Sequence, residues 1–265
     1  MSQSLGKPIY GTGNHFEWGD HQILKLYGPD VPRDWVKVLG RREKELFESG
    51  FPVPEVGDLV EIDDSLGQVY ERIEGKSIAD ELLSITDAGS EIVIKLANEF
   101  AEAHAKIHSF EDVQTEMPQQ KEFFPSILHR IEILPSDLRE ATLKTLEDMP
   151  DGNRVCHGDY HPYNIVQSPR GSIVIDWNNS HIGNPLEDVA RTKLILTGFS
   201  LMVPTISGVV DRFRDAYLER YFTLRPADQE QIEKWCPIVS AVRLIDDIPE
   251  IQDWLLEQIR MSFGE

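Results

Sequence analysis

The segment His157-Gly158-Asp159-Tyr160-His161-Pro162-Tyr163-Asn164 carries the side chains best suited to chemistry in this sequence. A second aspartate, Asp176, ends the apolar run Ile173-Val174-Ile175, twelve positions after Asn164. The carboxylate of Asp159 is suited to orient a substrate hydroxyl or to accept its proton. Asn164 and Asp176 offer the hard oxygen ligands that Mg²⁺ takes beside phosphate groups. Together these residues predict the transfer of a phosphoryl group to a hydroxyl.

Turns and metal sites offer simpler accounts of the same residue types. Asp and Asn are common in turns, so neither residue type alone would indicate catalysis. His157 and His161 flank Asp159 and would also suit a zinc hydrolase, but a zinc site needs three or four ligands at suitable spacing. We expect His157 to bond backbone groups and His161 to shape the turn. His104 and His108 lack the Glu of the His-Glu-x-x-His motif, so we expect them to be hydrogen-bonded helix residues in the core.

The segment after Asn164 is predicted to bring the two metal ligands together. Residues 164–167 and 172–176 are typical of the arms of a β-hairpin, and Ser168-Pro169-Arg170-Gly171 is typical of its turn. Because a hairpin returns the chain to its starting point, we expect the side-chain oxygens of Asn164 and Asp176 to lie near one another.

The rest of the chain predicts two structural parts. Residues 7–27 are typical of a hairpin, 34–49 of a helix, and 56–62 and 68–73 of two further strands. After Gly75, helices are predicted at 77–83, 92–108, 124–133, 136–149 and from 185 to about 199, followed by three more. The predicted fold class is therefore α+β, with a β-rich lobe over residues 1–74 and a larger helical lobe over 75–265. The cleft between the lobes would hold the site.

The catalytic segment resembles that of the aminoglycoside phosphotransferase and choline kinase family, small-molecule kinases with a protein-kinase-like two-lobe fold. The likeness rests on His-Gly-Asp at 157–159, Asn164, and Asp-Trp-Asn at 176–178. It extends to residues 183–191, which are similar to the family's Gly-Asp-Pro-x-x-Asp-Leu-Ala segment. The resemblance implies that Asp159 is the catalytic carboxylate and that His157 and Asp188 support its loop. It also implies ATP and Mg²⁺ as cofactors, with GTP as an alternative nucleotide.

In the first lobe, the resemblance implies a phosphate-binding lysine. The strand Gln22-Ile23-Leu24-Lys25-Leu26-Tyr27 is similar to the family's lysine-bearing strand, and a buried ammonium group needs an anionic partner. Lys25 would reach the α- and β-phosphates. Glu43 on the following helix is the expected acidic partner of Lys25, and Glu45 is the alternative.

Backbone groups are expected to complete the nucleotide site. Gly11 and Gly13 lie where a loop would cover the triphosphate, although two glycines between strands also make an ordinary turn. Glu71 and Ile73 are expected at the hinge between the lobes, where backbone groups would hold the adenine.

Composition narrows the class of partner. The 46 acidic and 26 basic side chains give a net charge of −20, which disfavours nucleic acid and favours a cationic small molecule, although acidity also serves solubility alone. The sequence has no apolar run of about 18 residues that would span a membrane. Two cysteines suit a reducing compartment. We expect a cytoplasmic protein that is a monomer or a homodimer.

The acceptor is predicted to be a small molecule with a hydroxyl group. An aminoglycoside-like compound is the first expectation, with choline, a sugar or another small alcohol as alternatives. Asp246, Asp247 and Glu250 would bind its ammonium groups, or would form a solvated face. Two other classes of function stay open, namely a catalytically inactive kinase-like protein that binds nucleotide and a metal-dependent hydrolase.

Overall fold

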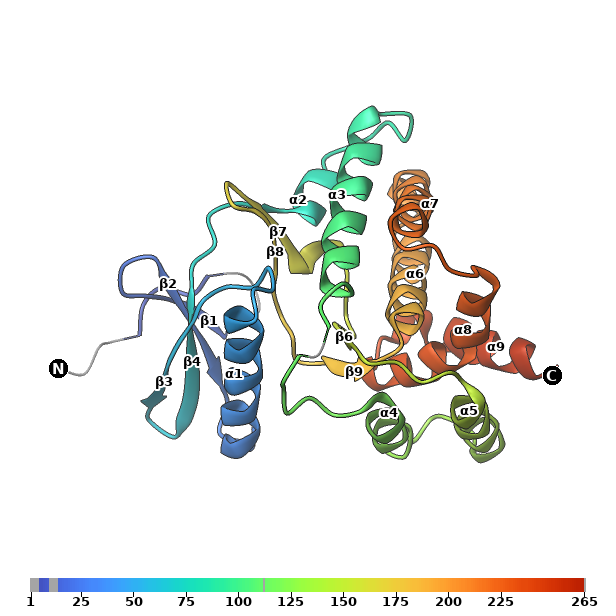
Figure 1. Cartoon of the computed structure of the whole chain (residues 1–265), viewed down its shortest axis with the longest axis horizontal. Helices are drawn as coiled ribbons and strands as arrows, with labels where there is room; N and C mark the ends of the chain where they lie inside the picture. Colours follow the sequence, from blue (N-terminus) through green and yellow to red (C-terminus); the bar gives the residue numbers. More distant parts are fainter. Residues whose placement is uncertain (1–4, 10–13, 112, 265) are drawn as a thin grey trace.

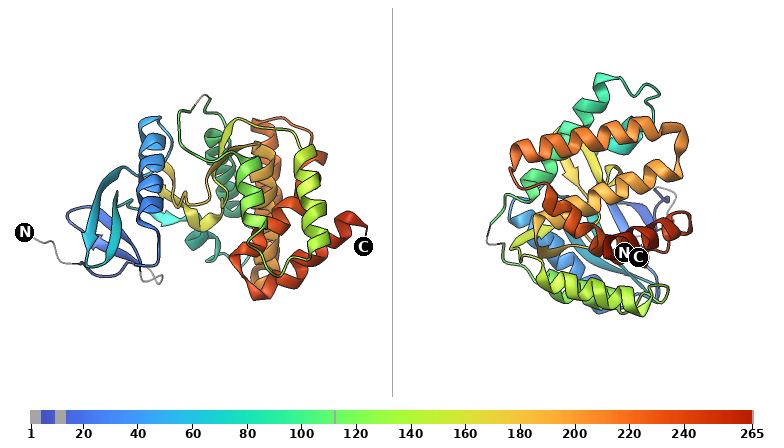
Figure 2. Two further views of the ribbon diagram at one scale, coloured as in Figure 1. Left: turned by 90° about the horizontal axis from the view of Figure 1, so that it is seen from below. Right: turned by 90° about the vertical axis from the view of Figure 1, so that its right-hand side faces the viewer.

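The β-rich beginning and the helical remainder of the chain form two parts that lie beside one another (Figure 1; Figure 2, left). The computed structural model describes residues 5–9, 14–111 and 113–264. Gly11 and Gly13, predicted to approach phosphate groups, fall outside the described residues. The mixed α and β architecture agrees with the predicted class, and the lobe boundary between residues 74 and 75 stays a proposal.

A four-stranded antiparallel sheet makes up most of the first part. Its order is β1-β2-β4-β3, formed by β1 (His15–Trp18), β2 (Gln22–Tyr27), β4 (Ser65–Glu71) and β3 (Val56–Ile62). Helix α1 (Arg33–Glu48) packs on the sheet through Val36 and Leu39, which contact Tyr27 and Leu66. Lys25 lies on the inner strand β2, so neighbouring strands fix its position on both sides.

Helices dominate the second part. They are α2 (Ile78–Leu82), α3 (Glu91–Ile107), α4 (Gln120–Leu128), α5 (Ser136–Asp148), α6 (Pro185–Met202), α7 (Ser207–Leu224), α8 (Glu230–Arg243) and α9 (Pro249–Phe263). Helix α6 packs against both α7 and α8 and buries residues around most of its circumference. Asn184 caps α6 by accepting a hydrogen bond from the Leu186 N–H, and Pro185 occupies its first turn. Helix α6 is therefore the central element of this part.

No single helix among the described residues has the length and apolar composition to cross a membrane. The segments Pro185–Met202 and Pro204–Leu224 pass that test only together, and they are bent by 110° where they meet.

Short strands shape the loops between the helices. Strands β5 (Lys76–Ser77), β7 (Ile165–Ser168) and β8 (Gly171–Val174) form a three-stranded sheet, and β6 (Arg154–Cys156) pairs with β9 (His181–Gly183). The predicted hairpin is present, but its arms lie closer to the turn than expected, because Ser168 already pairs with Gly171 and the strands end at Ile165 and Val174. Asn164 therefore precedes the hairpin, in the 3-10 turn η1 (Pro162–Asn164), and Asp176 follows it. The Ile175 N–H donates to the Asn164 carbonyl at 2.9 Å and closes the base of the hairpin.

Two other predicted boundaries differ from the structure. Strand β4 begins at Ser65 rather than at residue 68, because Asp63 adopts a left-handed φ of 51° and Ser65 pairs directly with Ile62. Helix α4 runs from 120 to 128 rather than from 124 to 133. The Arg139 guanidinium donates to the carbonyl of Leu128 at 3.0 Å and to those of residues 131 and 134, which satisfies the chain outside a helix.

The two parts are joined behind the site by aromatic packing. Phe51, just after α1, stacks on Phe110 with ring centroids 3.9 Å apart and contacts Trp177 edge-on at 6.1 Å. The Val174 N–H donates to the Pro52 carbonyl at 2.6 Å. These contacts fix the end of α1 against the segment that carries the predicted metal ligands.

Candidate active site

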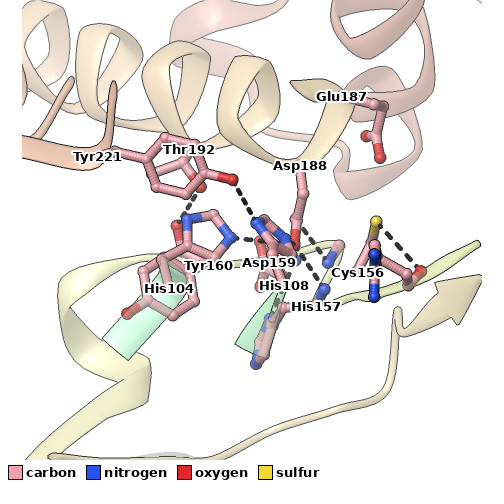
Figure 3. A network of polar contacts seen from close by, with 12 residues as sticks. His104, His108, Cys156, His157, Asp159, Tyr160, Glu187, Asp188, Thr192 and Tyr221 are labelled. Carbon is pink, nitrogen blue, oxygen red and sulfur yellow. Dashed lines mark hydrogen bonds and ion pairs between the residues drawn. The ribbon is translucent and has the colours of Figure 1, made fainter. Parts of the chain in front are cut away.

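A buried carboxylate, that of Asp188, holds the catalytic loop in place. Asp188 lies in the first turn of α6 and is fully buried. Its Oδ2 accepts a hydrogen bond from the His157 backbone N–H at 2.6 Å, and its Oδ1 accepts one from the Gly158 N–H at 2.9 Å. Figure 3 shows Asp188 among these partners. The loop is thus anchored immediately before Asp159.

Two histidines complete the surroundings of Asp188. His104 and His108, one turn apart on α3, place their Nε2 atoms 3.1 and 3.2 Å from Asp188 Oδ2. Each Nδ1 faces a tyrosine hydroxyl on α7, at 2.8 Å for Tyr217 and 2.7 Å for Tyr221. Burial and then the charge of His108 lower the pKa of His104 to about 3, so His104 is neutral and donates through Nε2–H. Burial would raise the pKa of Asp188, but the two histidine hydrogen bonds hold it well below its ordinary value.

Two groups of buried side chains have the spacing of metal ligands. Within each group the ligand atoms lie within 4.8 Å of one another; the groups are His104, His108, Asp188 and Cys156, His181, Glu187. In the first group, the close approach of the three side chains is explained by the hydrogen bonds of both histidines to Asp188. In the second, His181 Nε2 lies 3.0 Å from Glu187 Oε2. Burial would lower the pKa of His181, but Glu187 raises it overall, as expected for a buried ion pair.

Gly158 is required by the shape of the loop. Its φ of +75° lies in the left-handed region, and an added Cβ would meet the Asn179 carbonyl oxygen at 2.3 Å. Any other residue would push the loop away from Asn179 or away from Asp188. The His-Gly-Asp sequence therefore has a steric reason as well as a chemical one.

His157 connects the catalytic loop to the strand that leads to Asp176. Burial lowers the pKa of His157, so its ring is neutral. Its Nε2–H donates to the Ile175 carbonyl at 3.1 Å, and its Nδ1 accepts from the Asp159 N–H at 3.2 Å. One imidazole thus sets the spacing between the two aspartate segments, in agreement with the expectation that His157 bonds backbone groups.

The predicted metal ligands lie at the two ends of the short hairpin. The Asn164 side-chain amide donates to the Asp159 carbonyl at 3.0 Å, which fixes its orientation. Asp176 has a left-handed φ of 66°, a conformation that Asp and Asn tolerate better than most residues. Both side chains line one cavity, so the structure brings them to a common space.

The predicted partner of Lys25 is different in the structure. The Lys25 ammonium pairs with Asp176 Oδ1 at 2.9 Å, rather than with Glu43 or Glu45. Burial alone would lower the pKa of Lys25, but the charge and hydrogen bond of Asp176 raise it above its ordinary value. The sequence prediction was wrong because it considered only the neighbouring helix, whereas the segment after β8 lies closer to β2.

Glu43 lies in the same cavity and has a neighbour that the sequence analysis did not identify. The Tyr70 hydroxyl donates to Glu43 Oε2. Burial raises the pKa of Glu43 to about 7, although the hydrogen bond from Tyr70 and the charge of Lys25 act in the opposite direction. Glu43 therefore changes protonation near neutral pH.

One cavity of about 460 Å³ collects most of the predicted nucleotide-site residues. Its lining includes Lys25, Glu43, Glu71, Ile73, Asn164 and Asp176. Apolar side chains such as Ile23, Val56 and Ile175 supply other walls. A cavity of this size with apolar walls, one buried ammonium group and two oxygen donors has the composition of a site for a nucleotide and a divalent ion.

Asp159 adjoins this cavity through Asn164 and faces a different set of partners. Its Oδ2 lies 3.4 Å from His161 Nε2, and its Oδ1 lies 3.7 Å from Arg243 Nη1. Burial would raise the pKa of Asp159, but His161 and then Arg191 lower it well below its ordinary value. Asp159 is therefore ionised at neutral pH and can accept a hydrogen bond from a hydroxyl group.

The acidic residues predicted to bind the acceptor have separate environments. Asp246 Oδ2 pairs with Arg243 at 3.0 Å and with Arg191 at 3.4 Å. Asp247 and Glu250 are exposed on the surface. The carboxylate of Asp246 thus already has cationic partners, which sequence alone gave no means of foreseeing.

Known proteins resemble the chain over most of its length. A family model described as the phosphotransferase enzyme family matches residues 23–235, a range that includes Lys25, the catalytic loop and Asp188. The chain belongs to this phosphotransferase family. The predicted resemblance is thereby confirmed.

Solved structures with the same fold include three small-molecule kinases. An amicoumacin kinase in complex with AMP-PNP, Ca²⁺ and amicoumacin has a TM-score of 0.65 at 15% identity, over 96% of this chain and 88% of that one. A choline/ethanolamine kinase family protein from Mesorhizobium loti gives 0.64 at 17% identity, over 100% and 89%. An aminoglycoside-3′-phosphotransferase of type VIII gives 0.62 at 18% identity, over 91% of both chains. These matches confirm the predicted kinase-like fold.

One curated protein also matches part of the chain. The human (Homo sapiens) acyl-CoA dehydrogenase family member 11 is 27% identical over an alignment of 172 residues, which covers 57% of this chain. The chain spans only 22% of the length of that relative.

We expect Asp188→Ala to lower the free energy of unfolding by about 3–5 kcal/mol, because two backbone N–H groups and two histidines lose a buried charged acceptor. Urea denaturation measures the loss, and hydrogen exchange at residues 157 and 158 should accelerate. Asp253→Asn, an exposed change on α9, serves as the control. An Asp188→Ala protein as stable as the control would contradict the anchoring role.

The raised pKa of Glu43 predicts a pH-dependent effect of Glu43→Gln. Because the folded-state pKa of about 7 exceeds the ordinary value of 4.5, the protonated group's contribution to stability is complete below pH 4.5. It is lost as the pH rises through 7. The stability of the variant relative to the native protein should therefore rise by about 3 kcal/mol between pH 4.5 and 8.

Urea denaturation across this pH range tests the Glu43 prediction. Glu48→Gln, an exposed change on the same helix, should show no such trend. A difference between the Glu43→Gln and native proteins that stays constant with pH would exclude the raised pKa.

Proposed function

We propose that the protein is an ATP-dependent, Mg²⁺-requiring phosphotransferase that moves the γ-phosphoryl group to a hydroxyl of a small molecule. One observation carries the proposal: Lys25, Asn164 and Asp176 converge on a single cavity, and the anchored Asp159 lies beside it. Family membership supports the same reaction class.

The cavity suits a nucleotide in both its apolar and its charged regions. Apolar walls such as Ile23 and Val56 would enclose the base, and backbone groups near Glu71 and Ile73 would supply its hydrogen bonds. Lys25 would bind phosphate oxygens. Complexes of neighbouring folds with AMP-PNP and Ca²⁺ and with ADP support nucleotide and divalent-ion use. ATP is the proposed nucleotide, and GTP is the alternative.

Lys25 and Asp176, which form an ion pair with one another, are also the residues that would bind the phosphate groups and the divalent ion. Asp176 and Asn164 would bind the divalent ion, which would neutralise charge on the phosphate oxygens. Lys25 would then exchange its carboxylate partner for phosphate, with Glu43 close enough to contribute to the charge around its ammonium group. The pair therefore keeps the buried Lys25 ammonium group charge-balanced until cofactor binds.

Asp159 would act on the acceptor. Its ionised carboxylate would accept a hydrogen bond from the acceptor hydroxyl and align that oxygen with the γ-phosphorus. A bond forms between this oxygen and the phosphorus, the bond to the bridging oxygen breaks, and the nucleoside diphosphate leaves. The hydroxyl proton passes to Asp159 and then to solvent. Because the pKa of Asp159 is lowered, orientation is its main contribution, with proton transfer late in the reaction.

The acceptor is a small molecule, and the sequence-based choice is an aminoglycoside-like cation. That choice depended on the net charge and on Asp246, Asp247 and Glu250. Because Asp246 already pairs with two arginines, it no longer argues for a cationic acceptor. A cytoplasmic location and a monomeric or dimeric state belong to the same proposal.

A catalytically inactive nucleotide-binding protein is the alternative function. It would bind Mg-ATP but release no nucleoside diphosphate with any acceptor. A coupled assay for diphosphate release across acceptors of different charge, together with thermal shift by Mg-ATP, separates the two. Ligand at about 100 times Kd should stabilise the protein by roughly 2.7 kcal/mol. Absence of any Mg-ATP stabilisation would reject both functions.

Asp159→Asn should retain nucleotide binding and lower phosphoryl transfer by at least about a hundredfold, because the neutral amide orients the hydroxyl less strongly than the carboxylate and cannot accept its proton. Diphosphate release measures turnover, and Mg-ATP thermal shift measures binding. The exposed Asp253→Asn variant should keep native turnover. Near-native turnover by Asp159→Asn would exclude Asp159 as the catalytic carboxylate.

Asp176→Ala should weaken Mg-ATP binding by at least about tenfold, because it removes a predicted metal ligand. Titration calorimetry with Mg-ATP and with ATP in chelator distinguishes the roles. The metal-dependent part of the affinity should disappear, whereas metal-free binding should persist. An unchanged dependence on Mg²⁺ would contradict the assignment of Asp176.

A further inference from the structure

A second cavity, of about 160 Å³, borders the catalytic loop. His161, Pro162 and Tyr163 of the loop line it, together with Arg243. Tyr163 also lines the larger nucleotide cavity, so the two cavities share one side chain. The remaining lining is almost entirely apolar and comes from α2, α6 and α7; it includes Leu82, Ile195, Leu196, Phe199, Met202 and Val210. This cavity therefore has one polar end, formed by Arg243 and His161, and an apolar body.

The charged side chain that lines the polar end is a guanidinium group rather than a carboxylate. Arg243 and Arg191 are 8% and 3% exposed, and they share the carboxylate of Asp246. Arg243 Nη1 also lies 3.7 Å from Asp159 Oδ1. An ammonium group in this cavity would face a guanidinium group, which costs free energy because like charges repel where water is largely excluded.

Hydrogen-bond donors are left without partners on Arg243, which lines the cavity, and on Arg191 beside it. A guanidinium group carries five N–H donors, and buried donors without acceptors are costly. Among the described residues, Arg191 Nε and Nη1 and Arg243 Nε have no hydrogen-bond partner. His161 Nδ1, which donates only when it carries a proton, also lacks a partner within the part of the chain that the structure describes. Asp159 and Asp246 balance the charge of the two arginines, but they do not satisfy these donors.

We propose that the acceptor is an anion: a small molecule whose hydroxyl is bound by Asp159, whose carboxylate or phosphate group is bound by Arg243, and whose apolar body fills the smaller cavity. Arg191 is a positioning residue, because it shares Asp246 with Arg243 and does not line the cavity. Guanidinium groups bind carboxylates and phosphates through paired hydrogen bonds, which suits this arrangement. The inference rests on the proposed phosphotransfer and specifies its acceptor class.

A matched series of acceptors tests the charge preference. 2-Hydroxyhexanoate, 2-hydroxyhexyl phosphate, 1,2-hexanediol and 1-amino-2-hexanol share a six-carbon chain with a hydroxyl on the second carbon and differ in the group at the first carbon. Titration calorimetry in saturating Mg-ADP measures binding without turnover, and diphosphate release with Mg-ATP measures reaction. We expect one of the two anions to bind at least about tenfold tighter than the diol and the amine. The acid and the phosphate compared directly identify the preferred anion.

Variants of Arg243 separate binding from a purely structural role. Arg243→Gln should abolish the preference for the anion, raising its KM at least about tenfold while leaving the KM of hexanediol within about twofold. Arg243→Lys should keep part of the preference, because charge remains but the paired donors are lost. Arg260→Gln, an exposed change on α9, should leave the preference intact.

Different results would overturn the anionic acceptor and the phosphotransferase proposal. No preference for either anion over the diol and the amine, including no binding by any of the four, would overturn the anionic acceptor. So would an equal fall in kcat for every acceptor in Arg243→Gln with unchanged KM, because that pattern indicates only positioning of Asp159. Failure of Mg-ATP to bind would instead overturn the phosphotransferase proposal. Should both Arg243 variants fail to fold, the native acceptor series still decides.

Discussion

The buried charge of Asp188 is the constraint on which the active-site geometry depends. A carboxylate without exposure is stable only when donors surround it, and here two loop amides and two helix histidines do so. The donors come from α3 and the catalytic loop, whereas the acceptor comes from α6. Satisfying one charge therefore fixes three segments that are far apart in sequence. The position of Asp159, one residue beyond the anchored amides, follows from that requirement.

Local patterns predicted the parts of the site that lie close together along the chain. The hairpin between Asn164 and Asp176 follows from its turn residues and apolar alternation, and its register brings the two ligands to one cavity. The β-rich beginning and the helical remainder follow equally from periodicity. The boundaries of β4 and α4 were missed, because a left-handed aspartate and the guanidinium of Arg139 set them.

Contacts between distant segments were beyond the sequence argument. Lys25 was expected to pair with an acid on the next helix, but tertiary packing presents Asp176 instead. The i, i+4 spacing of His104 and His108 marked a shared helix face, yet nothing in the sequence indicated that Asp188 is their common partner. No sequence pattern indicated that Arg243 belongs to the site. It lies beyond the segment matched by the family model, and only the fold brings it to Asp159.

Helix α6 divides along its length into two zones with different tolerance to change. Its amino-terminal turn carries Asp188, the anchor of the loop, whereas its later turns supply Ile195 and Phe199 to the wall of the smaller cavity. Apolar exchanges of similar volume in a wall cost little free energy, whereas a lost buried charge costs several times more. Substitutions in the later turns of α6 can therefore change which acceptors the smaller cavity binds. The first turn of the same helix meanwhile keeps the catalytic loop in position.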